Sequence, residues 1–184
     1  MNLNLLKNVI LDSSFASSLS LIAVPSRNLV ADAEGLPSPQ SIRLAAGQEL
    51  TAPAVILAAR RYAAFWNSGE TRYAEAALSA NFVDRTLPPE RRPGFGGVLQ
   101  AAQNFRAAIP DLRTEIEDLL VVDHRAIVRQ VMTGHFTGQY QELKGDGRAV
   151  TARAVSIYRV QNGLISDNWH LEDSPTLTQQ LSRA

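Results

Sequence analysis

The dipeptide Asn162-Gly163 constrains the fold more strongly than any other feature of this chain. Both residues tolerate positive φ, which the central positions of a type I′ turn require, and such turns join antiparallel strands. Residues that favour sheets flank the dipeptide, at 150–160 before it and at 164–173 after it. The sequence therefore predicts a tight hairpin of two long antiparallel strands.

The spacing of apolar residues changes at Pro110. Before it, apolar residues recur every three or four positions, which predicts helices over 53–66, 72–79 and 98–109. After it, the pattern predicts strands over 114–122 and 126–137, in addition to the hairpin, and a short helix after Pro175. The stretch 81–97 contains clustered prolines and glycines and is predicted to be a loop.

Helices followed by a meander of strands are typical of an α+β fold. We expect the N-terminal helices to pack on one face of a curved, mainly antiparallel sheet. Such a sheet wraps into a cone-shaped α+β barrel, whose interior is a concave and mostly apolar pocket suited to a small hydrophobic ligand.

The length fits one domain with an N-terminal extension. We place the domain at residues 51–184 and interpret residues 1–50, rich in Ser, Pro and Gly, as an arm that is partly flexible or packed on a partner. Lys7 and the apolar residues after it match a secretory signal poorly, because Asp12 interrupts the apolar run. We therefore expect a cytoplasmic protein, with export as the alternative. No apolar run is long enough to span a bilayer, so we expect no membrane partner.

Charge and composition exclude several classes of function. Eighteen basic and eighteen acidic residues balance, so no overall field favours nucleic acid, and we expect no nucleic-acid partner. The chain has no cysteine, which excludes thiolate catalysis and cysteine metal sites. Its three histidines are too scattered for a recognisable zinc spacing, so we expect no metal site.

The acidic pair Glu172-Asp173 ends the last predicted strand. Because successive side chains of a strand point to opposite faces, Asp173 shares a face with Trp169 and Leu171, whereas Glu172 shares the other with His170. A carboxylate against an apolar face has a raised pKa, which suits it to acid and base catalysis near neutral pH. We therefore predict Asp173 as the catalytic group, with the N-cap of the following helix as its alternative role. Glu172 is interpreted as part of a polar stripe that faces solvent or a second subunit.

Several segments, in consistent order over residues 53–181, resemble the SnoaL-like polyketide cyclases, which are also known as ester cyclases. These proteins belong to the superfamily of nuclear transport factor 2-like folds. The segments that carry the resemblance are Tyr62-Ala-Ala-Phe-Trp-Asn67, Phe82-Val-Asp84, Ala108-Ile-Pro-Asp-Leu112, Gly134-His-Phe-Thr-Gly138, Ile157-Tyr-Arg-Val-Gln-Asn-Gly-Leu-Ile165, Asn168-Trp-His-Leu-Glu-Asp173 and Gln179-Gln-Leu181.

The resemblance implies a cone with a ligand cavity, a homodimer, and an intramolecular aldol ring closure that needs no cofactor. In the family, an aspartate in a Trp-x-x-x-Asp arrangement acts as acid and base, and Trp169 to Asp173 has that spacing. A polar side chain on the helix before Pro-Asp-Leu is matched by Asn104. Many relatives carry His after the Val-Asp of the second segment, where this chain has Arg85. Either the pocket favours a more anionic ligand, or Arg85 turns outward.

The other candidate residues are titratable or aromatic. His135 follows Gly134 on a predicted central strand and is a candidate third member of the catalytic set with Asp173 and Asn104. Aromatic side chains at helical spacing either line the cavity or fill the core. The side chains that we predict to contact the ligand are Tyr62, Trp66, Arg85, Phe105, Tyr158, Trp169 and His170.

Two functions follow from these observations. The first is a cyclase, or a closely related isomerase, in which a side chain removes a proton from the carbon next to a carbonyl group of a small hydrophobic compound, without a cofactor. The second is a small-molecule binding or dimerisation module that catalyses nothing, since a fold does not determine a function.

Overall fold

A computed structural model describes residues 22–24, 35–89 and 91–182. The helices are α1 Ala52–Ser68, α2 Thr71–Ala77, α3 Gly94–Ala108 and α4 Ser174–Ser182. The strands are β1 Ile22–Val24, β2 Ser41–Leu44, β3 Leu78–Asp84, β4 Arg113–Val122, β5 Arg125–Phe136, β6 Gln139–Tyr140, β7 Leu143–Lys144, β8 Arg148–Gln161 and β9 Leu164–Glu172.

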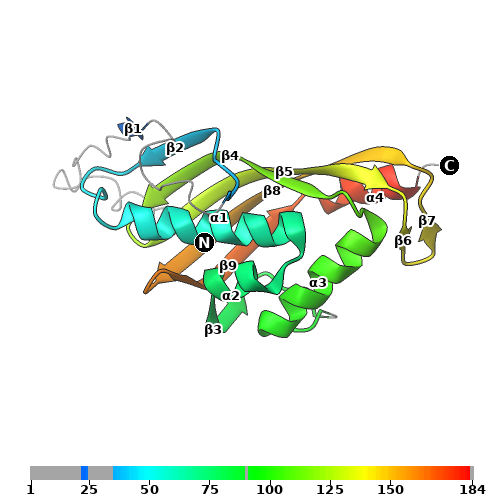
Figure 1. The fold of residues 1–184 in the computed structure, drawn as a ribbon, viewed down its shortest axis with the longest axis horizontal. Helices are drawn as coiled ribbons and strands as arrows, with labels where there is room; N and C mark the ends of the chain where they lie inside the picture. The colour runs from blue at the N-terminus through cyan, green and yellow to red at the C-terminus, as the bar shows by residue number, and fades with distance from the viewer. Residues whose placement is uncertain (1–21, 25–34, 90, 183–184) are drawn as a thin grey trace, which may run out of the picture.

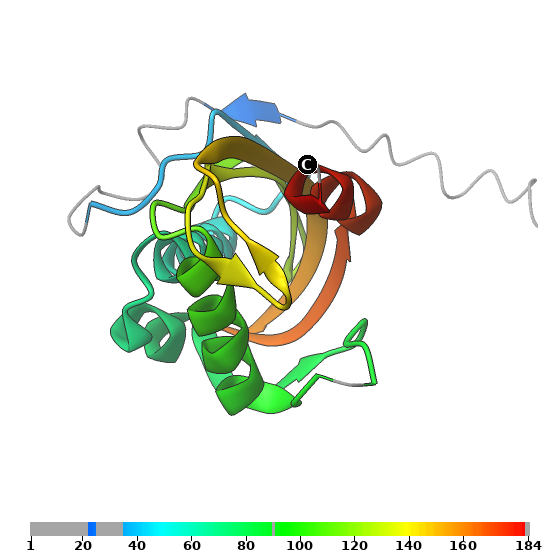
Figure 2. The ribbon, with the colours of Figure 1, turned by 90° about the vertical axis from the view of Figure 1, so that its right-hand side faces the viewer.

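The described strands form one large sheet of seven strands, in the order β1-β2-β4-β5-β8-β9-β3, and a small sheet of β6 and β7. The long strands β4, β5, β8 and β9 pair antiparallel. The end-on view in Figure 2 shows how strongly they curve. The large sheet does not close, because β1 and β3 are its two edges. The predicted α+β architecture, with helices packed on a curved, mainly antiparallel sheet, is confirmed.

The hairpin predicted from Asn162-Gly163 is confirmed. Both residues have positive φ, 51° at Asn162 and 77° at Gly163. The turn joins β8 to β9, whose register pairs Gln161 with Leu164 and Ser156 with His170. This register sets which side chains of the two strands stand next to each other on each face of the sheet.

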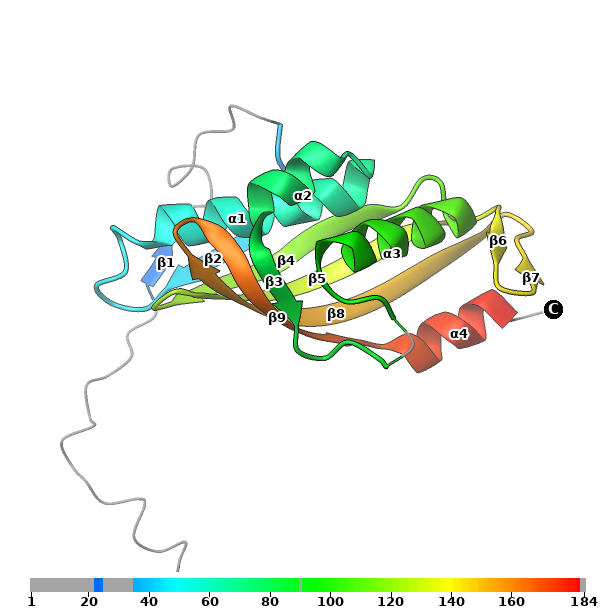
Figure 3. The ribbon, with the colours of Figure 1, turned by 90° about the horizontal axis from the view of Figure 1, so that it is seen from below.

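The concave face of the sheet carries the helices (Figures 1 and 3). One core cluster fills the space between α1 and the sheet, and it includes Phe65, Leu119 and Ile165. A second cluster lies under the end of α4, where Leu177 packs with Met132. On the opposite, convex face, side chains such as Val155 and Leu171 are exposed. The two faces of the sheet therefore have different environments.

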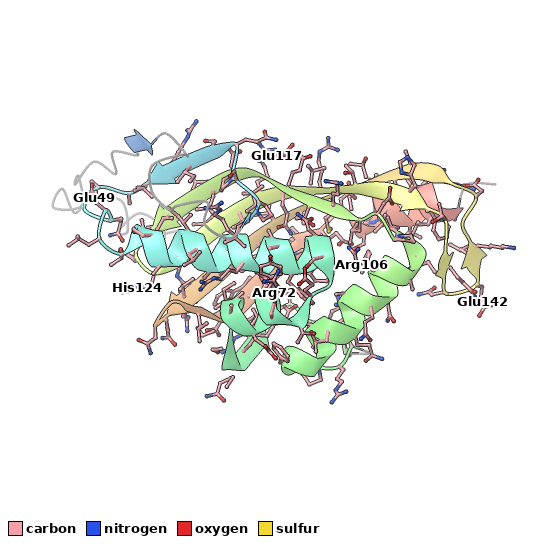
Figure 4. The ribbon with its side chains drawn as sticks, in the orientation of Figure 1. Glu49, Arg72, Arg106, Glu117, His124 and Glu142 are labelled. Carbon is pink, nitrogen blue, oxygen red and sulfur yellow. The ribbon has the colours of Figure 1, made fainter. Side chains whose placement is uncertain are left out.

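Arg106 connects α3 to α1 where the ends of these two helices meet (Figure 4). Its guanidinium donates hydrogen bonds to the backbone oxygens of Asn67 at 2.8 Å and Pro110 at 3.0 Å. On the same side of the molecule, the ring of Phe105 meets the ring of Trp66 edge to face, with centroids 6.3 Å apart. These contacts hold α1 and α3 against each other where the two helices cover the concave face of the sheet.

Five of the described strands were not predicted: the short strands β1, β6 and β7, and the parallel-paired strands β2 and β3. Residues 78–84 form β3, although 81–97 were predicted to be a loop. β3 pairs parallel with β9, and Asp84 lies opposite Asn168. Because these partners are more than 80 residues apart in the sequence, no local turn signal predicts the pairing. In the predicted arm, β2 pairs parallel with β4 and buries Ile42 and Leu44. The signal-like segment with Lys7 and Asp12 lies outside the described residues.

Candidate functional site

A cavity opens on the concave face, between the sheet and the helices α1 and α3. Its volume is about 50 Å³, and about 660 Å³ is free of protein atoms when the opening to solvent is included. The residues that line it are Tyr62 and Trp66 of α1; Phe82 and Asp84 of β3; Leu87, Arg91 and Arg92 of the next loop; Gly94, Gly97, Val98 and Phe105 of α3; Gln130 and Met132 of β5; Ser156 and Tyr158 of β8; and Asn168, His170 and Glu172 of β9.

One wall of the cavity is formed by three neighbouring residue pairs of β8 and β9, and we call it the polar wall. The strand registers place Tyr158 beside Asn168, Ser156 beside His170, and Ala154 beside Glu172. Because residues two apart on a strand share a face, all six side chains are on the concave side. The small side chain of Ala154 leaves space next to the Glu172 carboxylate. These pairs therefore place an amide, an imidazole and a carboxylate side by side along β9.

The imidazole of His170 is held from both sides. Its Nδ1 lies 2.9 Å from the Ser156 hydroxyl, and its Nε2 lies 3.9 Å from an oxygen of Glu172. The side chain of His170 is 28% exposed and that of Glu172 is 15% exposed, so both can reach a ligand while most of their surface is buried. The backbone N–H of His170 donates to the Thr86 hydroxyl at 2.8 Å, which fixes β9 against the loop after β3.

The deep end of the cavity contains two phenols. Burial raises the pKa of Tyr158 to about 12, with a smaller contribution from Asp84, while its hydrogen bond with Ser156 acts in the opposite direction. Burial raises the pKa of Tyr62 even further, helped by the nearby Tyr158. The two rings meet edge to face with centroids 5.7 Å apart. Both hydroxyl groups keep their protons at neutral pH and are available as hydrogen-bond donors.

Five of the predicted ligand-contacting residues line the cavity. They are Tyr62, Trp66, Phe105, Tyr158 and His170. Their binding of a ligand stays a prediction, but the sequence placed them at one site although they come from four different elements. The aromatic residues of α1 and α3 form the apolar roof, and His170 belongs to the polar wall.

Asp173 does not line the cavity. It is exposed, and one of its carboxylate oxygens accepts a hydrogen bond from the backbone N–H of Thr176 at 3.2 Å, in the first turn of α4. The expectation that it lies against an apolar wall inside the sheet is therefore wrong. The face it would share with Trp169 and Leu171 is the convex one, and Leu171 is 77% exposed there. Its alternative role as a helix cap fits this geometry.

Arg85 and Trp169 also lie on the convex side. Arg85 donates to Asp167 at 2.7 Å. Burial alone would raise the pKa of Asp167, but hydrogen bonds from Ser166 and Arg85 outweigh it and lower that pKa. The guanidinium groups of Arg125 and Arg159 both lie over the ring of Trp169, 5.3 and 5.5 Å from its centre. Of the two alternatives for Arg85, the outward orientation is the observed one.

His135 and Asn104 lie away from the cavity. Asn104 is on the exposed side of α3. His135 is at the far end of β5, where its Nδ1 lies 2.7 Å from the carboxylate of Asp111 and its backbone N–H donates to the same group at 2.7 Å. The structure therefore does not bring the predicted catalytic set of Asp173, His135 and Asn104 together.

The pair of His135 and Asp111 gives a testable effect of pH. The hydrogen bond from His135 is the main reason why the pKa of Asp111 is below its usual value. A lowered carboxyl pKa contributes stability above the unfolded-state pKa, and that stability disappears as the pH falls through the lowered value. We expect the pKa of Asp111 to rise toward its usual value in His135→Ala, as measured by NMR titration. An unchanged pKa would contradict the assigned cause.

Sequence reasoning missed most of the polar wall. Glu172, Ser156, Asn168, Gln130 and Asp84 all line the cavity. The signal that could have found two of them was present, because Asn168 and Glu172 alternate along one strand with His170, which was predicted. That stripe was interpreted as facing solvent or a partner. A polar stripe that faces inward is expected only where a sheet lines a cavity.

Two features are absent from the part of the chain that the structure describes. In residues 22–24, 35–89 and 91–182, no three His, Asp or Glu side chains are grouped closely enough to hold a metal ion. Over the same ranges, no helix is both long enough and apolar enough to cross a membrane.

Comparison with known proteins identifies the family. The model of the SnoaL-like polyketide cyclase family matches residues 56–181. The chain belongs to the SnoaL-like polyketide cyclase family. A protein named as a polyketide cyclase from Bacillus cereus is 35% identical to this SnoaL-like chain, with 80% of this chain and 94% of that one aligned and a TM-score of 0.70.

Two other solved structures share the SnoaL-like fold. TsrD from Streptomyces laurentii is 22% identical, with 70% of this chain and 95% of TsrD aligned and a TM-score of 0.63. IdmH from Streptomyces antibioticus is 20% identical, with 70% of this chain and 99% of IdmH aligned and a TM-score of 0.62. No curated protein matches the chain.

Proposed function

We propose that this SnoaL-like protein is a cofactor-free cyclase or isomerase in which His170 moves a proton at the carbon next to a carbonyl group of a small hydrophobic compound. The observation that carries the proposal is the placement of the His170 imidazole in the cavity wall, between the Ser156 hydroxyl at 2.9 Å and the Glu172 carboxylate at 3.9 Å. An imidazole can both accept and donate a proton, which suits it to general acid and base catalysis.

The neighbours of His170 favour one arrangement of its protons. Ser156 lowers the pKa of Tyr158, which is the effect expected if its hydroxyl donates toward the phenol oxygen. Ser156 then accepts a hydrogen bond from Nδ1–H of His170 through its oxygen, which leaves the lone pair of Nε2 free. When Nε2 takes up a proton, the Glu172 carboxylate stabilises the resulting positive charge.

The chemical steps balance without a cofactor. Nε2 removes a proton from the ligand carbon, the electron pair of that C–H bond forms a C=C double bond to the carbonyl carbon, and the π electrons of the C=O bond move to the oxygen to form an enolate. Because the pKa of Tyr158 is raised to about 12, its hydroxyl keeps its proton at neutral pH and can donate a hydrogen bond to this oxygen. In a cyclisation, the enolate carbon attacks a second carbonyl carbon of the same molecule, and the imidazolium returns the proton to the new alkoxide. In an isomerisation, the proton returns to another carbon.

The test is proton exchange with solvent. A β-keto ester such as ethyl benzoylacetate, dissolved in D₂O with the protein, should exchange its α proton faster than it does alone, as followed by NMR. An exchange rate equal to that without protein would reject the catalytic proposal.

A second candidate function is supported by the size of the cavity. Its volume of about 50 Å³ is small beside the roughly 300 Å³ or more of typical ligand pockets. A ring-sized ligand must therefore extend into the mouth next to Arg91 and Arg92. This geometry also suits a module that binds a small molecule without converting it, and such a module would bind the β-keto ester without accelerating exchange.

The homodimer implied by the family resemblance also stays a proposal, and the convex face is where we place it. Val155 and Leu171 are neighbours across β8 and β9 and are 42% and 77% exposed, next to the partly buried pair of Ile157 and Trp169. Exposed apolar side chains that gather on one sheet face are typical of a protein interface.

Leu171→Glu tests this interface. It introduces a charge at the centre of the proposed contact, and we expect the dimer to dissociate into monomers at micromolar concentration, as measured by analytical ultracentrifugation. Leu50→Glu is the control, because Leu50 is 95% exposed outside the sheet. A wild-type monomer, or a Leu171→Glu dimer as stable as the wild type, would contradict the proposal.

A further inference from the structure

The side-chain amide of Asn168 is buried without a partner. Asn168 is 4% exposed, and its Oδ1 accepts no hydrogen bond. Its Nδ2 is not one of the fully buried unpaired atoms, and no hydrogen bond joins it to another residue of the described part of the chain. Buried polar groups of native proteins nearly always have a hydrogen-bond partner, because burial removes the water that would otherwise satisfy them. An unpaired amide therefore needs an explanation.

The fold holds this amide in place without satisfying it. The backbone oxygen of Asn168 accepts from the N–H of Arg85 at 2.8 Å, and its neighbours across the strands are Tyr158 and Asp84. Asn168 lines the cavity together with both of these residues. The sheet therefore fixes the backbone that carries this amide, and the side chain is among those that line the cavity, where a ligand can supply its partner.

A primary amide has a specific recognition pattern, since it accepts through its oxygen and donates through its nitrogen. A ligand matches both groups if it carries a hydroxyl hydrogen next to a carbonyl oxygen. The enol form of a 1,3-dicarbonyl compound has this arrangement. A ligand with a carbonyl group alone would satisfy the nitrogen and leave the buried oxygen unpaired.

We propose that Asn168 is a specificity-determining residue that selects ligands in which an enol hydroxyl stands next to a carbonyl group. The inference rests on the proposed function for the location of the ligand, and it defines the class of substrate further. It assigns to Asn168 the anchoring of the ligand and leaves proton transfer to His170, one position along the same face of β9.

Binding of a matched pair of ligands tests the proposal. Benzoylacetone is present mainly as its enol, and its enol methyl ether keeps the same carbon skeleton and carbonyl group but carries a methyl group in place of the hydroxyl hydrogen. We expect the wild-type protein to bind benzoylacetone about tenfold or more tightly than the ether, as measured by isothermal titration calorimetry. We expect Asn168→Leu to bind the two compounds equally. No binding of benzoylacetone, equal binding of both compounds by the wild type, or unchanged discrimination in Asn168→Leu would each overturn the proposal.

Thermal unfolding without ligand provides a second test. Asn168→Leu removes the unpaired amide at similar volume, so we expect its Tm to rise by about 2–4 °C. A lower Tm would show that the amide stabilises the fold, which also overturns the proposal. Ser79→Ala is the control, because the Ser79 hydroxyl is likewise buried and unpaired but lies outside the cavity. Ser79→Ala should retain the wild-type preference for benzoylacetone.

The same ligands separate this proposal from the proposed function. In His170→Gln, the preference for benzoylacetone over its ether should persist even though proton exchange is lost. Preference without any exchange in the wild type would reject the catalytic role of His170 and leave the role of Asn168 intact. Proton exchange in the wild type without a preference for benzoylacetone would reject the role of Asn168 and leave the catalytic role of His170 intact.

Discussion

His170→Gln is expected to reduce the rate at which the protein exchanges the α proton of a β-keto ester by about 10²–10⁴-fold, the range of a lost general base. Glutamine keeps a polar side chain near Ser156 but cannot take up the proton. The rate is followed by NMR in D₂O at saturating ester. Glu172→Gln should reduce exchange by less, because Glu172 stabilises the protonated imidazole from 3.9 Å and does not accept the proton itself.

Asp173→Asn is the matched control for this experiment. Asparagine is as good an N-cap residue as aspartate, so the hydrogen bond to Thr176 can persist and the fold should remain intact. We expect wild-type exchange in this variant. The role that the family resemblance implies for Asp173 stays a prediction, and this control also tests it. Lost exchange in Asp173→Asn, with normal exchange in His170→Gln, would transfer the catalytic role to Asp173.

Gly97→Ala is expected to destabilise the protein by about 3 kcal/mol, near the upper end of the range for overpacking. A Cβ at Gly97 would lie 1.7 Å from the backbone oxygen of Arg92, and a backbone atom cannot move aside by changing a side-chain rotamer. The loop that carries Arg92 borders the cavity, so the substitution must push this loop away from α3. Urea unfolding measures the change in free energy.

The neighbouring Gly96 gives the control for the same helix. A Cβ there would meet only the end of the Arg92 side chain, at 3.2 Å, and that side chain can move. Alanine also favours a helix over glycine by about 1 kcal/mol. Gly96→Ala should therefore be neutral or stabilising by up to about 1 kcal/mol. If both variants had the same stability, the close packing of Gly97 against the loop would be refuted.

Local signals in the sequence predicted the elements whose partners are close along the chain. Asn162-Gly163 predicted the β8–β9 hairpin, because turn geometry depends on two adjacent residues. The change of spacing at Pro110 separated α1, α2 and α3 from the long strands. β3 and β2 were missed because each pairs parallel with a distant strand, and parallel pairing leaves no turn signal in the sequence.

Only part of the candidate site was predicted, because the wrong face of β9 was assumed to point to the interior. The apolar residues Trp169 and Leu171 were assigned to the interior, and Asp173 with them. In the structure, arginines contact Trp169 on the convex face, while the polar residues His170 and Glu172 face the cavity. The usual alternation is inverted here, since the polar side chains of β9 line the cavity and Leu171 is exposed on the convex face. Sequence periodicity alone cannot distinguish these two situations.

The positions of the two tryptophans have a practical consequence for solution work. The chain has two tryptophans, Trp66 in the cavity wall and Trp169 in contact with two arginines on the opposite side of the sheet. Each indole emits light whose wavelength and intensity depend on its own surroundings. In a Trp169→Phe background, the emission of Trp66 tests the proposed binding of a ligand in the cavity. In a Trp66→Phe background, the emission of Trp169 tests the proposed dimer. One spectrometer can thus follow both events separately, without any added dye.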